Sequence, residues 1–153
     1  MILLVEDDDG HAQLILRNLK RAGVANEIVR ARDGRDALDF IGCAGAYANR
    51  APKAPLLIVL DINMPRVDGV EVLRILKASA VTAKIPVIML TTTDDPREID
   101  RCYGLGCSVY ISKPIKYENF VDALNRLGLF LEIIKVPTAR EQQAPPSAGP
   151  SAT

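Results

Sequence analysis

Short apolar runs alternate along the chain with segments whose apolar residues recur every three or four positions. The runs have the length of β-strands. Two of them, "LLIVL" and "PVIML", are apolar throughout, as in strands that are buried on both faces. We predict strands over residues 1–5, 26–31, 56–60, 86–90 and 108–112, and helices over residues 9–22, 33–44, 69–79, 95–106 and 117–131. Strands and helices therefore follow one another in alternation.

This alternation predicts an α/β fold with a parallel sheet that is covered by helices on both faces. Right-handed crossovers leave few topologies for five strands and five helices. We predict a flavodoxin-like, doubly wound five-stranded sheet in the order 2-1-3-4-5. Residues 1–136 are expected to form one domain, whose last helix extends into a further apolar segment. Residues 137–153 lack large apolar side chains and are expected to be a disordered tail.

Composition narrows the class of protein. Among 153 residues, 48% are hydrophobic and 25% are charged, as in soluble globular proteins. The 19 basic residues balance the 19 acidic ones, which argues against nucleic-acid binding through a general basic field. No apolar run approaches the ~20 residues that span a membrane. Cys43, Cys102 and Cys107 lack metal-ligand spacing, so we expect reduced thiols and a cytoplasmic location.

Polar residues follow the predicted strands at the points where a doubly wound sheet binds its ligands. They are Glu6 and Asp7 in "LLVEDDD", Asp61 in "LLIVLDINMP", Thr91 and Thr92 in "VIMLTTT", and Lys113 in "YISKP". The first and third strands are neighbours in the predicted order, so three carboxylates should converge. Clustered hard oxygen ligands require a cation and favour Mg²⁺. A lysine and a threonine hydroxyl beside them would suit the oxygens of a phosphoryl group.

Four motifs together resemble the receiver domains of two-component response regulators. The motifs are "LLVEDDD", "VLDINMPRVDG", "IMLTTT" and "YISKP", in the order and with the separations typical of that family, and the resemblance covers about residues 1–131. It implies that the chain accepts a phosphoryl group from a histidine kinase in a Mg²⁺-dependent reaction. It also implies signalling through protein contacts, with no enzymatic activity beyond the chain's own phosphorylation and dephosphorylation.

The resemblance assigns a role to each residue of the acidic cluster. Asp61 would be the phosphoryl acceptor, and Lys113 would pair with the phosphoryl group. Glu6 and Asp7 would hold Mg²⁺ together with Asp61. Asn63, two residues further on, would contribute its backbone carbonyl to the metal.

Further residues would carry the response to phosphorylation. Thr91 would bond a phosphoryl oxygen and shift inward, and Tyr110 would be the switch aromatic that turns in when Thr91 moves. The side chains of Asn63 and Thr92 would flank the site and set the lifetime of the phosphorylated state. Pro114 would follow a cis peptide bond, as in similar proteins.

Simpler structural roles explain some of these residues. Asp8 or Asp9 is expected to cap the first predicted helix, because acidic residues are favoured at a helix N-terminus. A cap does not explain Glu6 and Asp7, which precede the helix. His11 lies in the first turn of that helix and is expected to be a solvated polar residue.

Other functions remain open at this point. A haloacid dehalogenase-type phosphohydrolase also uses an Asp nucleophile with Mg²⁺, but it needs a second Asp where this chain has Asn63. A flavodoxin-like flavin carrier would need a hydroxyl- and glycine-rich loop where this chain has acids. A phosphorelay shuttle that passes the group to a histidine phosphotransfer protein is not distinguished from a terminal regulator. A receiver that is never phosphorylated is disfavoured by the complete set of residues.

The segment "LGLFLEIIKV", residues 127–136, is more apolar than one buried helical face requires. We expect it to form a homodimer interface with the face of the fourth helix, fifth strand and fifth helix. The alternative is that it folds back on its own domain as an extra strand or a longer helix. This segment and the 45–55 loop resemble those of single-domain regulators that partner phytochrome histidine kinases. No output domain is expected, so the chain should act through protein contacts and not through nucleic acid or membrane.

Overall fold

The computed structural model describes residues 1–55, 57–113, 118, 122 and 125–126. Its elements are β1 (Ile2–Val5), α1 (Asp9–Arg21), β2 (Ile28–Ala31), α2 (Gly34–Gly42), a 3₁₀ turn η1 (Gly45–Tyr47), β3 (Leu57–Leu60), α3 (Gly69–Ala78), β4 (Val87–Thr91), α4 (Pro96–Leu105) and β5 (Val109–Ser112). Four helices are thus found in this part of the chain. Of the helix predicted over 117–131, the structure describes only residues 118, 122 and 125–126, all of them helical. The apolar segment 127–136, the tail and the cis bond expected at Pro114 lie on or depend on residues outside the described part.

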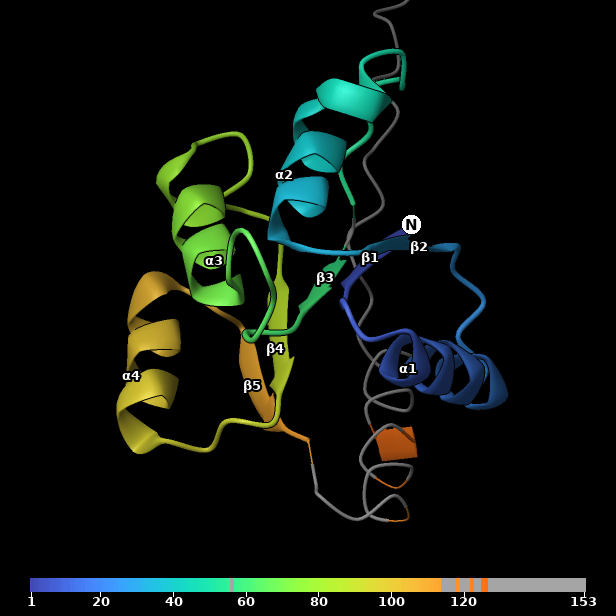
Figure 1. Cartoon of the computed structure of the whole chain (residues 1–153), viewed down its shortest axis with the longest axis vertical. Coiled ribbons are helices and arrows are strands. Elements are labelled where there is room, and N and C mark those ends of the chain that lie inside the picture. The colour runs from blue at the N-terminus through green and yellow to red at the C-terminus, as the bar shows by residue number, and fades with distance from the viewer. Residues whose placement is uncertain (56, 114–117, 119–121, 123–124, 127–153) are drawn as a thin grey trace, which may run out of the picture.

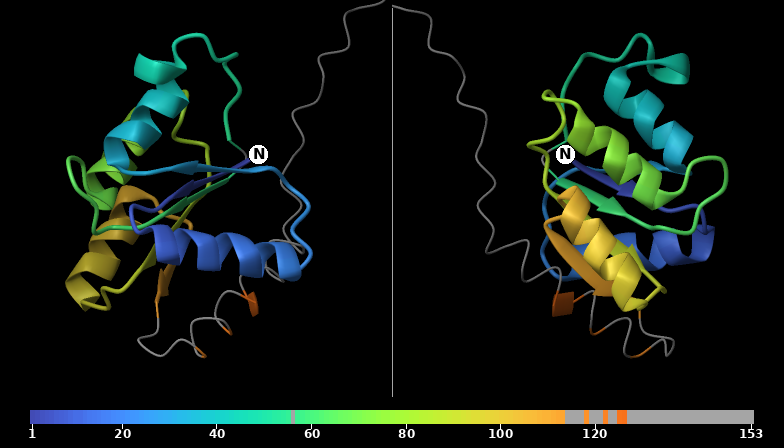
Figure 2. Two further views of the ribbon diagram at one scale, coloured as in Figure 1. Left: turned by 45° about the vertical axis from the view of Figure 1, so that its right-hand side comes forward. Right: turned by 90° about the vertical axis from the view of Figure 1, so that its left-hand side faces the viewer.

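The five strands form one parallel sheet in the order β2-β1-β3-β4-β5 (Figure 1). This order is the predicted one, and each strand begins within two residues of its predicted start. Helix α1 covers one face of the sheet, whereas α2, α3 and α4 cover the other (Figures 1 and 2). All strand C-termini therefore point to the same edge, where the candidate site residues were expected.

The core lies in two layers, one on each face of the sheet. Alternate residues of β1 and β3 point to opposite faces, so both strands must be apolar at every position. Leu3 and Ile58 join the cluster under α2, α3 and α4, whereas Leu4 and Val59 join the cluster under α1. Each such buried side chain stabilises the fold by roughly 1.5–3 kcal/mol, and this holds the ends of β1 and β3 rigidly together.

All four described α-helices begin with an aspartate N-cap. In each case the carboxylate accepts a hydrogen bond from a backbone N–H of the first turn, which stabilises a helix by about 1 kcal/mol. The caps, each given with the residue whose backbone N–H it accepts, are Asp8 with His11, Asp33 with Asp36, Asp68 with Glu71, and Asp95 with Arg97. Asp8 is therefore the expected cap of α1. The two acids before it are left free for the site.

Two details differ from the sequence-based expectation. Strand β4 extends to Thr91, which was expected just after the strand. The loop before β3 contains η1 and is ordered by Arg50, whose guanidinium donates to the Phe40 carbonyl and lies 3.9 Å from the centre of the Phe40 ring. These contacts join residues ten apart through a side chain, which hydrophobic periodicity does not detect.

Three further observations concern residues that the structure describes. Cys43, Cys102 and Cys107 are free thiols, and the latter two are buried. His11 is exposed on the first turn of α1. Among the residues that the structure describes, no helix has the length and apolar character that crossing a bilayer demands.

Candidate functional site

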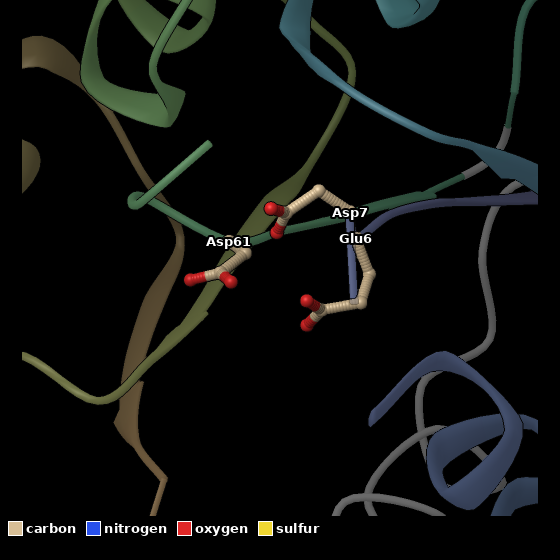
Figure 3. Close-up of side chains that lie close together, drawn as sticks. All are labelled: Glu6, Asp7 and Asp61. Carbon is tan, nitrogen blue, oxygen red and sulfur yellow. The ribbon is translucent and has the colours of Figure 1, made fainter. Parts of the chain in front are cut away.

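Three carboxylates meet beyond the ends of β1 and β3. The two strands pair in register up to Val5 and Leu60, and the Asp61 amide donates to the Val5 carbonyl at 3.1 Å. Glu6 and Asp7 follow β1 directly, so their side chains leave the sheet beside that of Asp61 (Figure 3). Each of the three offers an oxygen that lies within 4.8 Å of the other two. The predicted convergence of these acids is confirmed.

The three acids differ in burial. Glu6 is 1% exposed and Asp61 is 8% exposed, whereas Asp7 is open to solvent. The group therefore has a closed side at Glu6 and an open side at Asp7. Its hard oxygen donors match the ligands that Mg²⁺ and similar divalent cations prefer, and such an ion retains several waters when one or two carboxylates bind it. The donor set and its partial exposure to water therefore fit a divalent cation.

Lys113 supplies a positive charge within this group. It follows β5 and is 5% exposed. Its Nζ lies 2.5 Å from Glu6 Oε2 and 3.3 Å from Asp61 Oδ2. One ammonium thus faces two carboxylates that are almost removed from water. The predicted place of Lys113 beside the acceptor candidate is confirmed, and its bond to Glu6 fixes the ammonium there.

The pKa of Glu6 is raised above its usual value. Burial is the largest cause, because it disfavours the charged carboxylate. The hydrogen bond and positive charge of Lys113 lower this pKa, and the nearby charge of Asp61 raises it again. Ionised Glu6 therefore costs folding stability, and the cost grows as the pH rises through its folded-state pKa. A cation bound by these acids would offset that cost.

Thr93 connects three of the residues that the sequence singled out. Its backbone N–H donates to Thr91 Oγ1 at 3.5 Å, its Oγ1 accepts from the Asn63 amide at 3.4 Å, and its carbonyl accepts from the Tyr110 hydroxyl at 2.6 Å. Thr91 is fully buried, whereas Thr92 is exposed. The structure thus brings Thr93, and not Thr92, to Asn63.

Tyr110 is partly buried and packs against the core under α4. Burial, together with nearby negative charges, raises the pKa of its hydroxyl to about 12, so it remains a hydrogen-bond donor throughout the physiological range. The Tyr110 backbone N–H donates to the Tyr103 hydroxyl of α4 at 3.1 Å. Strand β5, helix α4 and the loop that carries Thr93 are therefore joined at this residue.

Two glycines allow the loop after β3 to pack closely. A Cβ on Gly69 would lie 2.0 Å from the carbonyl oxygen of Asp61, and a Cβ on Gly34 would lie 2.0 Å from that of Val67. Both distances are far shorter than any van der Waals contact. The first turn of α3 thus rests directly on the backbone of Asp61, and only glycine permits this approach.

An ion pair anchors the same loop to α2. Arg66 has a left-handed backbone, with φ of 65°, and its guanidinium binds the Asp33 carboxylate. Partial burial raises the pKa of Asp33, but the hydrogen bonds from the Asp36 amide and from Arg66 outweigh it and hold that pKa below its usual value. The Asp33 carboxylate therefore both caps α2 and anchors the loop that carries Arg66.

The chain matches the family described as response regulator receiver domain over residues 2–125. The response regulator Rcp1 of Synechocystis sp. (strain PCC 6803) is 34% identical over 140 residues, which cover 91% of this chain and 94% of Rcp1. The crystal structure of the Mn²⁺-bound form of Rcp1 has a TM-score of 0.83 at 32% identity and covers 90% of this chain and 98% of that one.

Two further solved structures are similar over nearly their whole length. A receiver domain from Rhodospirillum rubrum has 47% identity and a TM-score of 0.80, and the match covers 89% of this chain and 96% of that one. The phosphorylated cyanobacterial phytochrome response regulator RcpA has 33% identity and a TM-score of 0.81, and the match covers 90% of this chain and 97% of RcpA. The family match, the sheet order and the acidic group agree. This chain belongs to the response regulator receiver domain family.

Proposed function

We propose that Asp61 accepts a phosphoryl group from a phosphohistidine of a histidine kinase, with Mg²⁺ held by Glu6, Asp7 and Asp61 itself. The observation that carries this proposal is the convergence of the three carboxylates on one point with Lys113 among them. A bound cation would screen the negative charge that otherwise keeps a phosphoryl group from a carboxylate. The backbone carbonyl of Asn63 is the further ligand that the family resemblance suggests.

The transfer forms one bond and breaks one. A carboxylate oxygen of Asp61 attacks phosphorus, the P–N bond to the kinase histidine breaks, and the imidazole nitrogen keeps the electron pair. Lys113 Nζ already lies 3.3 Å from Asp61 Oδ2 and is held there by Glu6, so it is in place to bind a phosphoryl oxygen without rearrangement. Attack of water on the phosphorus of the resulting acyl phosphate later restores the Asp61 carboxylate.

Phosphorylation is then expected to bias an equilibrium between two conformations. Thr91 would bond a phosphoryl oxygen, and Tyr110 would respond as the switch aromatic. The hydrogen bonds of Thr93 support this part of the proposal, because they already link the Thr91 hydroxyl to the Tyr110 hydroxyl through one residue. Asn63 and Thr92 remain the candidates that set the lifetime of the phosphorylated state. Thr93 becomes a third candidate, because its hydroxyl oxygen accepts a hydrogen bond from the Asn63 amide.

The histidine kinase that phosphorylates this chain is the next part of the proposal. Relatives such as RcpA are named as phytochrome response regulators, so we propose a phytochrome-type histidine kinase as the phosphodonor of this chain. Signalling would proceed through protein contacts in the cytoplasm.

Incubation with acetyl phosphate and Mg²⁺, followed by intact mass measurement, tests the acceptor. Wild type is expected to gain one phosphoryl group, and Asp61→Asn is expected to gain none. Asp68→Asn is the matched control, because Asp68 lies on the same loop, is exposed, and caps α3 in a way that asparagine reproduces. It should be phosphorylated like wild type. An adduct that survives Asp61→Asn would place the acceptor elsewhere.

We also propose a homodimer through the face of α4, β5 and the helix predicted over residues 117–131, together with residues 127–136. Its support is the apolar character of that segment, which exceeds the needs of one buried face. Light scattering of the full chain at micromolar concentration is expected to give the mass of a dimer. A shortened chain that ends at residue 126 should then be monomeric. A monomeric full chain would contradict the proposed dimer.

A further inference from the structure

Arg30 of β2 reaches past the end of its own strand to the loop between β1 and α1. Its Nε donates to the Glu6 carbonyl at 3.0 Å and its Nη2 to the Asp7 carbonyl at 3.2 Å. Its Nη1 lies 2.6 Å from Asp9 Oδ1. The side chain is only 17% exposed. One guanidinium therefore holds both acids that follow β1 and the first residue of the helix beyond them.

The loop needs such a contact because the sheet does not extend to it. Backbone pairing between β1 and β2 ends with the bond from the Glu6 amide to the Ala31 carbonyl, at 3.1 Å. Four consecutive acidic residues follow, from Glu6 to Asp9, and their like charges oppose close packing. The planar guanidinium, with its several donors, suits a set of three acceptors in a way that an ammonium does not.

We propose that Arg30 is a positioning residue for the cation site. It fixes the backbone of Glu6 and Asp7 so that their carboxylates converge on Asp61. Its bonds go to the two carbonyls and to Asp9, and the ligand carboxylates themselves remain available to a cation. Lys113 differs in this respect, because it binds the Glu6 carboxylate directly. This inference rests on the proposed function of the acidic group as a cation site.

A positioning role of Arg30 and an effect of its charge alone predict opposite changes in the affinity for a divalent cation when Arg30 is removed. A positive charge close to a divalent cation weakens binding by repulsion, so loss of Arg30 would strengthen binding if its charge alone mattered. If Arg30 positions the loop, its loss would weaken binding, as removal of groups that orient metal ligands commonly does. The sign of the change in affinity therefore separates the two.

Mn²⁺ binding to the full chain, followed by the electron paramagnetic resonance signal of free Mn²⁺, measures this change. Arg30→Ala is expected to raise the Kd for Mn²⁺ about tenfold. Arg30→Lys keeps the charge but not the fork of donors, and it should lie between Arg30→Ala and wild type. Arg32→Ala is the matched control, since Arg32 also faces Asp9 but at 3.4 Å and with a 72% exposed side chain. It should bind Mn²⁺ like wild type.

Each outcome bears on one proposal or the other. Unchanged or tighter Mn²⁺ binding by Arg30→Ala would overturn the positioning role of Arg30. The proposed cation site would still stand in that case, provided that wild type binds Mn²⁺. If wild type itself bound no Mn²⁺, the proposed function would fail. Circular dichroism shows whether each variant is folded. Should Arg30→Ala not fold, Arg30→Lys decides: weaker binding supports the role, and wild-type binding overturns it.

Discussion

Replacement of Gly69 by alanine is expected to destabilise the protein by about 3 kcal/mol or more and to slow phosphorylation. The added Cβ would lie 2.0 Å from the Asp61 carbonyl oxygen and 2.8 Å from its carbonyl carbon. These are backbone atoms, so no rotation of a side chain relieves the overlap, and either α3 or the end of β3 must move. Urea unfolding measures the first effect, and the rate of adduct formation with acetyl phosphate measures the second.

Gly104→Ala is the control for this substitution. Gly104 lies inside α4, and a Cβ there would meet nothing within 4 Å. Alanine should therefore stabilise that helix, by up to ~1 kcal/mol, and leave phosphorylation unchanged. A Gly69→Ala protein as stable and as reactive as wild type would show that the backbone of Asp61 does not depend on close packing with α3.

Lys113→Met is expected to lower the free energy of unfolding by about 3 kcal/mol near neutral pH, measured with urea. Methionine keeps most of the apolar stem but removes the ammonium, which leaves the buried Glu6 carboxylate without the cation that lies 2.5 Å from it. Breaking a buried pair on one side costs more than the pair contributes, because the remaining charge stays desolvated. The exposed Lys84, replaced in the same way, should change stability very little.

The loss of unfolding free energy caused by Lys113→Met should become smaller as the pH falls. Lys113 lowers the pKa of Glu6, so its removal raises that pKa further above the usual value. As the pH falls through this raised pKa, Glu6 becomes neutral and no longer needs a partner, so the loss should shrink. In a Glu6→Gln background the substitution should cost less near neutral pH, and the costs in the two backgrounds should converge at low pH, where Glu6 is neutral. An equal loss with and without the Glu6 carboxylate would contradict the ion pair as its cause.

The apolar pattern was sufficient to predict the sheet and the main residues of its site. Runs such as residues 56–60 can be buried only between two layers of helices, which restricts the topology to a doubly wound sheet. Once β1 and β3 are neighbours, Glu6 and Asp61 must lie together, because both follow their strands directly. Lys113 was placed by the same argument at the end of β5.

The contacts that refine the site could not be predicted in this way. They join residues far apart in sequence through particular side-chain directions: Arg30 to the carbonyls of Glu6 and Asp7, and the Gly69 approach to the Asp61 backbone. The run Thr91 to Thr93 shows the limit clearly. Three identical residues follow one another, and only the folded structure shows that the third contacts Asn63 while the second faces solvent.

Reduction of the phosphorylated protein with borohydride, followed by peptide mass mapping, tests the site most directly, because borohydride converts an aspartyl phosphate to homoserine and so marks its position. With acetyl phosphate and Mg²⁺ we expect homoserine at position 61 alone, and with Mg²⁺ removed by a chelator we expect none. Homoserine at another position, or labelling of Asp61 that persists without a divalent cation, would contradict a cation-dependent phosphoryl acceptor built from Glu6, Asp7 and Asp61.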